Sequence, residues 1–82
     1  MLKLINIKKD DNMIEADYIP ESSEKSAHIS LNIKTEEYTA DDIKEYGSVY
    51  SRMAANGLIR TLKELSSGKR NELPKERLVM WY

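Results

Sequence analysis

Several residue types that carry chemistry are scarce in this 82-residue sequence. Cysteine is absent, which excludes disulfides and thiolate metal ligands and makes a reducing cytoplasm the expected location. A single histidine, His28, is too few for a zinc site. The only glycines, at positions 47, 57 and 68, are isolated, so none of them builds a phosphate-binding loop. We therefore expect neither a metal nor another cofactor.

Long hydrophobic runs are also missing. No apolar stretch reaches the roughly 18 residues that a membrane helix needs. Lys3 interrupts the apolar N-terminus, so no uninterrupted signal-peptide core is present. The sequence predicts one domain spanning residues 1–82 with no membrane segment.

Charge is unevenly distributed along the chain, although the net charge is only −1. Residues 1–47 contain six lysines and eleven acidic residues, a net charge of −5, whereas residues 48–82 contain seven basic and three acidic residues, a net charge of +4. One interpretation is that the two halves attract each other within the fold. The other is that one face binds a charged partner.

Three segments show the alternation typical of β-strands. Residues 2–8 and 13–19 flank the turn-forming sequence Asp10-Asp11-Asn12 and predict a hairpin. A slip or bulge in the first of these strands separates Leu2 and Leu4 from Ile5 and Ile7. Residues 27–34 alternate most regularly, which is typical of an antiparallel sheet with one face in contact with water.

The second half of the chain predicts one long helix. From about residue 48 to 67, apolar residues recur on one half of the helical wheel, with Ser48 as N-cap and Gly68 after the last turn. Gly57 interrupts this helix, and close approach of another element would explain it. Residues 35–47 form either a short helical turn, with Thr39 and Asp42 as a capping box, or a further strand.

An apolar strand at residues 77–82 closes the chain, so the predicted fold is α+β with the order β-β-β-α-β. We expect an antiparallel or mixed sheet of about four strands, with the helix packed on one of its faces. A short, hairpin-rich chain of this kind is typical of small bacterial or phage proteins.

No arrangement of residues indicates catalysis. His28 lies on the polar face of its predicted strand, and no Gly-x-Ser-x-Gly turn accompanies it. Glu15 and Asp17 share a strand face, where an open, charged sheet surface is the simplest interpretation. We therefore predict that the protein is not an enzyme.

Basic residues on the outer face of the helix are a candidate for contacts with nucleic-acid phosphates. Arg52, Arg60 and Lys63 fall within one 80° arc of the wheel, a stripe of the kind that phosphate contacts require. A solvated helix face is the alternative, and the sequence pI of 5.8 argues against nucleic acid. The complete candidate set is Arg52, Asn56, Arg60, Lys63, Lys69 and Arg70.

The aromatic C-terminus is the second candidate surface. Trp81 and Tyr82 follow Val79 on the last strand, and buried aromatic side chains each remove about 150–250 Å² from water. Trp81 either packs beneath residues 35–47 or forms an interface with another protein or a second copy of this chain. The candidate interface comprises Val79, Trp81 and Tyr82.

A small, non-enzymatic interaction or accessory protein is therefore the function that the sequence favours, with protein partners or homodimerisation. The alternative is a nucleic-acid-binding protein that uses the basic helix face. Two further interpretations have weaker support: an acidic mimic of nucleic acid built on residues 1–47, and a small enzyme built around His28.

Overall fold

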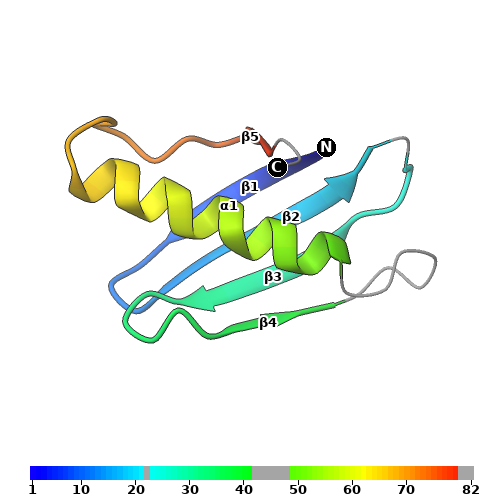
Figure 1. Ribbon diagram of the computed structural model, residues 1–82, viewed down its shortest axis with the longest axis horizontal. Coiled ribbons are helices and arrows are strands. Elements are labelled where there is room, and N and C mark those ends of the chain that lie inside the picture. The colour runs from blue at the N-terminus through cyan, green and yellow to red at the C-terminus, as the bar shows by residue number, and fades with distance from the viewer. Residues whose placement is uncertain (22, 42–48, 80–82) are drawn as a thin grey trace.

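The computed structural model describes residues 1–21, 23–41 and 49–79. A five-stranded antiparallel sheet with the strand order β4-β3-β2-β1-β5 forms one layer, and helix α1 lies across one of its faces (Figure 1). The elements are β1 (Leu2–Lys9), β2 (Met13–Pro20), β3 (Ala27–Asn32), β4 (Tyr38–Ala40), α1 (Val49–Ser66) and β5 (Arg77–Val79). The predicted α+β class and the helix on one sheet face are confirmed, and the sheet has one strand more than the expected four.

The additional strand, β4, lies in the segment whose sequence allows either a helical turn or a strand. Tyr38 pairs with Leu31, and Ala40 pairs with Ile29, so β3 supplies the ladder that keeps this short segment extended. Thr39 is part of the strand and does not begin a helix. Its proposed capping partner, Asp42, lies outside the described residues.

A bulge in β1 determines which of its side chains reach the core. The pairing with β2 shifts between Ile5 and Lys8, and Asn6 has a φ of 54°. Asparagine tolerates this left-handed conformation better than most residues do. Because the extra residue shifts the alternation by one position, Ile7 is buried with Leu2 and Leu4, whereas Ile5 lies half-buried on the opposite face. The predicted irregularity in this strand is confirmed, but it follows Ile5, so the predicted grouping of Ile5 with Ile7 is wrong.

The core lies between α1 and one face of the sheet. Alternate residues of β2 and β3 are buried, as the period-2 pattern predicts. The opposite face carries Glu15, Asp17 and His28. The buried hydrophobic residues are Leu2, Leu4, Ile7, Ile14, Ala16, Tyr18, Ile29, Leu31, Ala54, Ala55, Leu58 and Val79.

Helix α1 approaches the β1–β5 side of the sheet closely at Gly57. A Cβ atom placed there would lie 2.6 Å from Val79 Cγ2 and 3.2 Å from Leu4 Cδ1. Gly57 thus allows the close contact that the sequence suggested. Gly68, with a φ of 82°, follows the last turn, and the Lys69 amide donates to the Glu64 carbonyl. The predicted N-cap, Ser48, lies outside the described residues.

Candidate functional site

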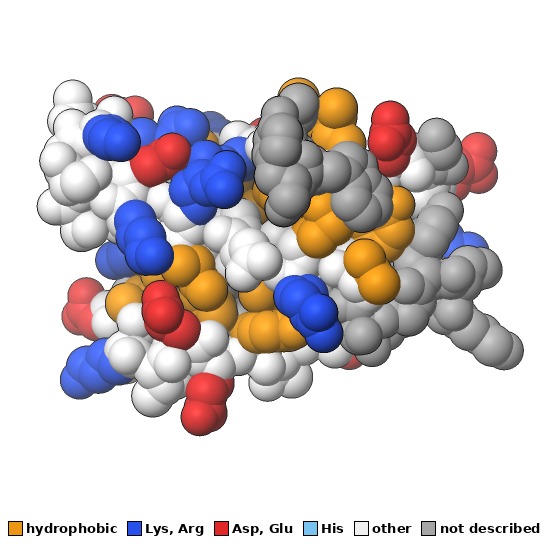
Figure 2. All heavy atoms as spheres, viewed as in Figure 1, with side chains coloured by type: hydrophobic (Ala, Val, Ile, Leu, Met, Phe, Trp, Pro, Cys, Tyr) orange, Lys and Arg blue, Asp and Glu red, His pale blue; other side chains and the backbone are white. Residues whose placement is uncertain are grey.

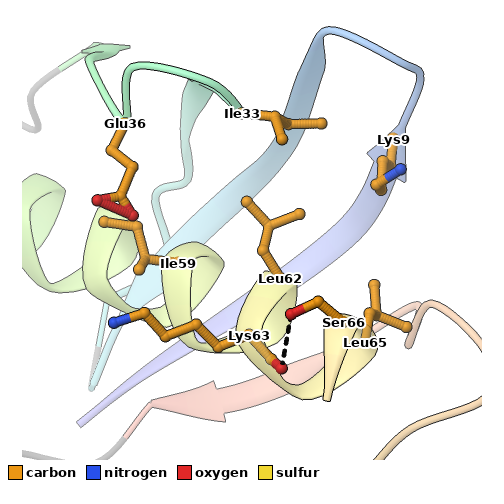
Figure 3. A pocket seen from close by; sticks show the side chains of 8 residues that line it. All are labelled: Lys9, Ile33, Glu36, Ile59, Leu62, Lys63, Leu65 and Ser66. Atoms are coloured by element: carbon orange, nitrogen blue, oxygen red, sulfur yellow. Dashed lines mark hydrogen bonds between the residues drawn. The ribbon is translucent and has the colours of Figure 1, made fainter. Parts of the chain in front are cut away.

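An open groove runs beside the C-terminal half of α1, with a volume of about 440 Å³ (Figure 3). The helix forms one wall, and the other wall comes from the end of β1 and from the segment that joins β3 to β4. Its apolar surface consists of half-buried branched side chains. The lining residues are Lys9, Ile33, Glu36, Ile59, Leu62, Lys63, Leu65 and Ser66.

The groove exists because the apolar arc of α1 is wider than the arc that the sheet covers. Ala54, Leu58 and Thr61 are buried. Ile59 and Leu62 belong to the same predicted apolar half of the wheel, yet they are only half-buried. At 100° per residue they lie on the side of the helix away from Gly57 and β5. The apolar surface that the sheet leaves uncovered therefore faces the groove.

Two tight turns hold the far wall of the groove in place. Asp10 Oδ1 accepts hydrogen bonds from the amides of Asn12 (2.7 Å) and Met13 (2.8 Å), and these bonds lower the pKa of the Asp10 carboxyl. The Ile33 amide donates to the Asn12 carbonyl at 3.0 Å, which ties the start of the β3–β4 connection to this first turn.

The second turn is built on Asn32. Its side-chain Oδ1 accepts from the backbone amides of Lys34 (2.9 Å) and Thr35 (3.1 Å), and its own backbone amide donates to the Glu37 carbonyl at 2.8 Å. The Glu36 amide in turn donates to the Asn32 carbonyl at 2.9 Å, with Glu36 at a φ of 64°. Because local hydrogen bonds hold both turns, this wall is preformed rather than assembled on binding.

A cationic ridge, defined by Arg52, Arg60, Lys63 and Lys69, runs along the solvent-exposed side of α1 and past its C-terminal end. All four residues are exposed, and none forms an ion pair within the part of the chain that the structure describes. Lys63 belongs to both the ridge and the groove. Lys and Arg side chains lie next to exposed hydrophobic side chains on the helix side of the molecule (Figure 2).

Arg70, which was also predicted to contact nucleic acid, differs from the ridge residues because it forms an ion pair with Glu64. Its Nε donates to Glu64 Oε1 at 2.9 Å. Arg77 also binds Glu64, with Nη1 to Oε1 at 2.6 Å and Nη2 to Oε2 at 3.1 Å, and donates to Thr61 Oγ1 at 2.9 Å. The Arg77 and Arg70 bonds lower the pKa of Glu64 from 4.5 to about 2. Asn56 is exposed on the outer face of the helix.

A polar cluster lies on the opposite, open face of the sheet. His28 Nδ1 is 3.1 Å from Asp17 Oδ1, and its Nε2 is 3.8 Å from Glu15 Oε2. Asn6 Nδ2 donates to Asp17 Oδ2 at 3.1 Å, and this bond, followed by the His28 bond, lowers the pKa of Asp17. The His28 side chain is 48% exposed on a flat strand surface.

The C-terminal candidate surface is described only as far as Val79. Val79 is 9% exposed and packs over Gly57, whereas the neighbouring Leu78 is 60% exposed beside Lys3 on the open sheet face. Trp81 and Tyr82 lie outside the described residues. An interface at this strand stays a prediction.

Sequence reasoning missed the groove and the role of Asn6. The sequence does contain a pattern that predicts the helical wall of the groove, because an apolar arc that continues through Ile59, Leu62 and Leu65 exceeds what one sheet face covers. It contains no pattern that predicts the far wall, because Lys9, Ile33 and Glu36 meet only when the two turns fold against each other. Likewise, the bulge alone brings Asn6 next to Asp17.

The described residues contain no group of three or more His, Cys, Asp or Glu side chains arranged to hold a metal ion. Among them, no helix combines the length and the apolar character needed to cross a membrane. Comparison with known proteins adds no assignment: no protein-family model, no curated protein and no solved structure matches this chain.

Proposed function

We propose that this protein is a non-enzymatic interaction protein that binds a segment of another protein in the groove beside α1. The observation that carries the proposal is the apolar surface of Ile33, Ile59 and Leu62, which a preformed wall keeps open to solvent. Burying apolar surface contributes about 25 cal/mol per Å². A partner that covers these side chains therefore gains the stabilisation that the sheet does not provide.

The dimensions and chemistry of the groove suit a peptide segment. Binding pockets typically measure about 300–1,000 Å³ and combine an apolar lining with a few polar groups. Here the lining is aliphatic, with Lys9, Glu36 and Lys63 at its borders (Figure 3). A groove beside a helix is also the setting in which amphipathic segments bind by their apolar faces.

Selection from a displayed random-peptide library, followed by NMR mapping, tests the proposal. We expect selected peptides to shift the methyl signals of Ile33, Ile59 and Leu62. The substitution Leu62→Asn should weaken binding at least about tenfold. Val49→Asn is the matched control, because Val49 is 55% exposed at the other end of the same helix.

Ile33→Asn provides a second variant from the opposite wall, and urea unfolding of each variant separates lost binding from lost folding. Selected peptides that bind with unchanged affinity to both Leu62→Asn and Ile33→Asn would contradict the proposal. So would a library from which nothing is enriched.

Nucleic-acid binding is the second candidate function, favoured because the cationic ridge forms no ion pair with any residue that the structure describes. Gel shifts with duplex and single-stranded DNA at low salt test it, because phosphate contacts weaken as salt rises. Arg52→Glu with Arg60→Glu should then abolish the shift. Lys8→Glu with Lys75→Glu, which changes the net charge equally away from the ridge, should retain it. No shift, or a shift that survives the ridge substitutions, excludes this function.

A further inference from the structure

We propose that the segment bound in the groove is an acidic amphipathic helix, an inference that rests on the proposed function and specifies its partner. The charges around the groove carry it. Lys9 and Lys63 line the groove from opposite walls. Glu36 is the one acidic residue in the lining. The rim is therefore positively charged on balance.

The helix that forms one wall contributes no carboxylate to this side. Glu64 is the single acidic residue of α1, and it faces the other side of the helix, where Arg70 and Arg77 bind it. Lys63 consequently has no acidic neighbour within its own helix on the groove side, whereas Arg60, four residues before Glu64, shares the side of that carboxylate. A partner that supplies carboxylates would complement Lys9 and Lys63, which form no ion pair within the described part of the chain.

The arrangement of apolar and basic positions suits a helical partner. At 100° per residue, Lys63 lies about 40° from Ile59 on the helical wheel, so apolar and basic side chains of α1 line the groove together. A helix packs about 8–10 Å from its neighbour. A partner helix with apolar residues directed at Ile59 and Leu62 would therefore place acids three or four positions away within reach of the ridge.

The sheet also leaves room beside α1. Five strands at about 4.8 Å spacing span about 19 Å between the outer strands, whereas one helix with its side chains is about 10 Å wide. In Figure 1 α1 crosses the sheet obliquely, and its C-terminal half lies away from the β3–β4 turn. That is the end at which the groove opens.

Three synthetic helical peptides with identical leucine positions, and with Glu, Gln or Lys at the polar positions, test the charge of the partner. Fluorescence anisotropy with the full chain measures each Kd. Exposed ion pairs typically change affinity by a factor of about 1.5–5 each. We therefore expect the Glu peptide to bind about tenfold more tightly than the Lys peptide at low salt, and the difference to shrink at high salt.

Lys9→Glu with Lys63→Glu should invert this preference, whereas Lys8→Glu with Lys75→Glu, with the same change of net charge elsewhere, should preserve it. Equal binding of all three peptides would overturn the acidic partner and leave the proposed function standing. Failure of all three to bind, together with an unproductive library selection, would overturn both. If duplex DNA displaces the Glu peptide at lower concentration than unlabelled Glu peptide does, the ridge serves nucleic acid and the inference is wrong.

Discussion

Replacing Gly57 by alanine adds one methyl group at the point where α1 lies closest to β5. The new Cβ would lie 2.6 Å from Val79 Cγ2, a separation that real Cβ contacts do not show, so one of the two elements has to move. Valine offers little relief, because branching at its own Cβ makes its χ1 stiff. Leu4 Cδ1, at 3.2 Å, is the end of a longer side chain and can yield by a few tenths of an ångström.

Two opposing terms set the magnitude. Alanine in a helix interior is favoured over glycine by about 1 kcal/mol. Overpacking a well-filled core costs about 1–3 kcal/mol. We expect the second term to prevail, so that Gly57→Ala lowers the free energy of unfolding by about 1 kcal/mol. In a Val79→Ala background the clashing methyl groups of Val79 are gone. Gly57→Ala should then raise the free energy of unfolding by about 0.5–1 kcal/mol.

Urea unfolding followed by far-UV circular dichroism measures all four members of this double-mutant cycle. Asn56→Ala, at an exposed position of the same helix, calibrates the propensity term, with an expected gain of about 0.5 kcal/mol. The reasoning is refuted if Gly57→Ala stabilises the otherwise unchanged protein. It is also refuted if the effect has the same sign and size with and without Val79.

The Glu64 network supports two further predictions. Glu64→Gln should cost about 1–2 kcal/mol at neutral pH, because Arg77 loses a charged partner. The Glu64 pKa is lowered on folding, so its contribution is present above pH 4.5 and is lost as the pH falls towards about 2. Between pH 4.5 and about 2, the free energy of unfolding should therefore fall less steeply with decreasing pH in Glu64→Gln than in the unchanged protein. An unchanged slope would contradict this. Thr61→Val should cost about 1 kcal/mol by urea unfolding, because its buried hydroxyl accepts from Arg77, and equal stability would show that the bond contributes nothing.

The alternation of apolar residues made the faces of β2 and β3 predictable, because every second side chain of a strand must point to the same side. The same reasoning located α1 and the left-handed Gly68 at its end, since both depend on local geometry. The sequence pattern predicted β4 less clearly. Tyr38 and Ala40 extend only because β3 offers a ladder, and such pairing has no local pattern in three residues.

The candidate sites likewise fall into those that local geometry predicts and those that depend on contacts between distant segments. The basic stripe on α1 was readable because helical spacing alone brings Arg52, Arg60 and Lys63 together. The pairing of Arg70 with Glu64 was not, because this contact depends on how the chain turns after the helix. The groove likewise needed the fold, since its walls come from segments that are distant in the sequence.

The sequence by itself determined the α+β class, the amphipathic helix, the strand faces and the absence of thiol chemistry, all of which follow from residue type and short-range periodicity. Only the tertiary structure decided which part of the apolar arc of α1 is covered. Val79 packs over Gly57 on one side of the helix, whereas Ile59 and Leu62 on its other side line the groove and are only half-buried. The physical reason is that burial depends on which surfaces meet, and that choice is made by contacts between distant segments rather than by the pattern within any one of them.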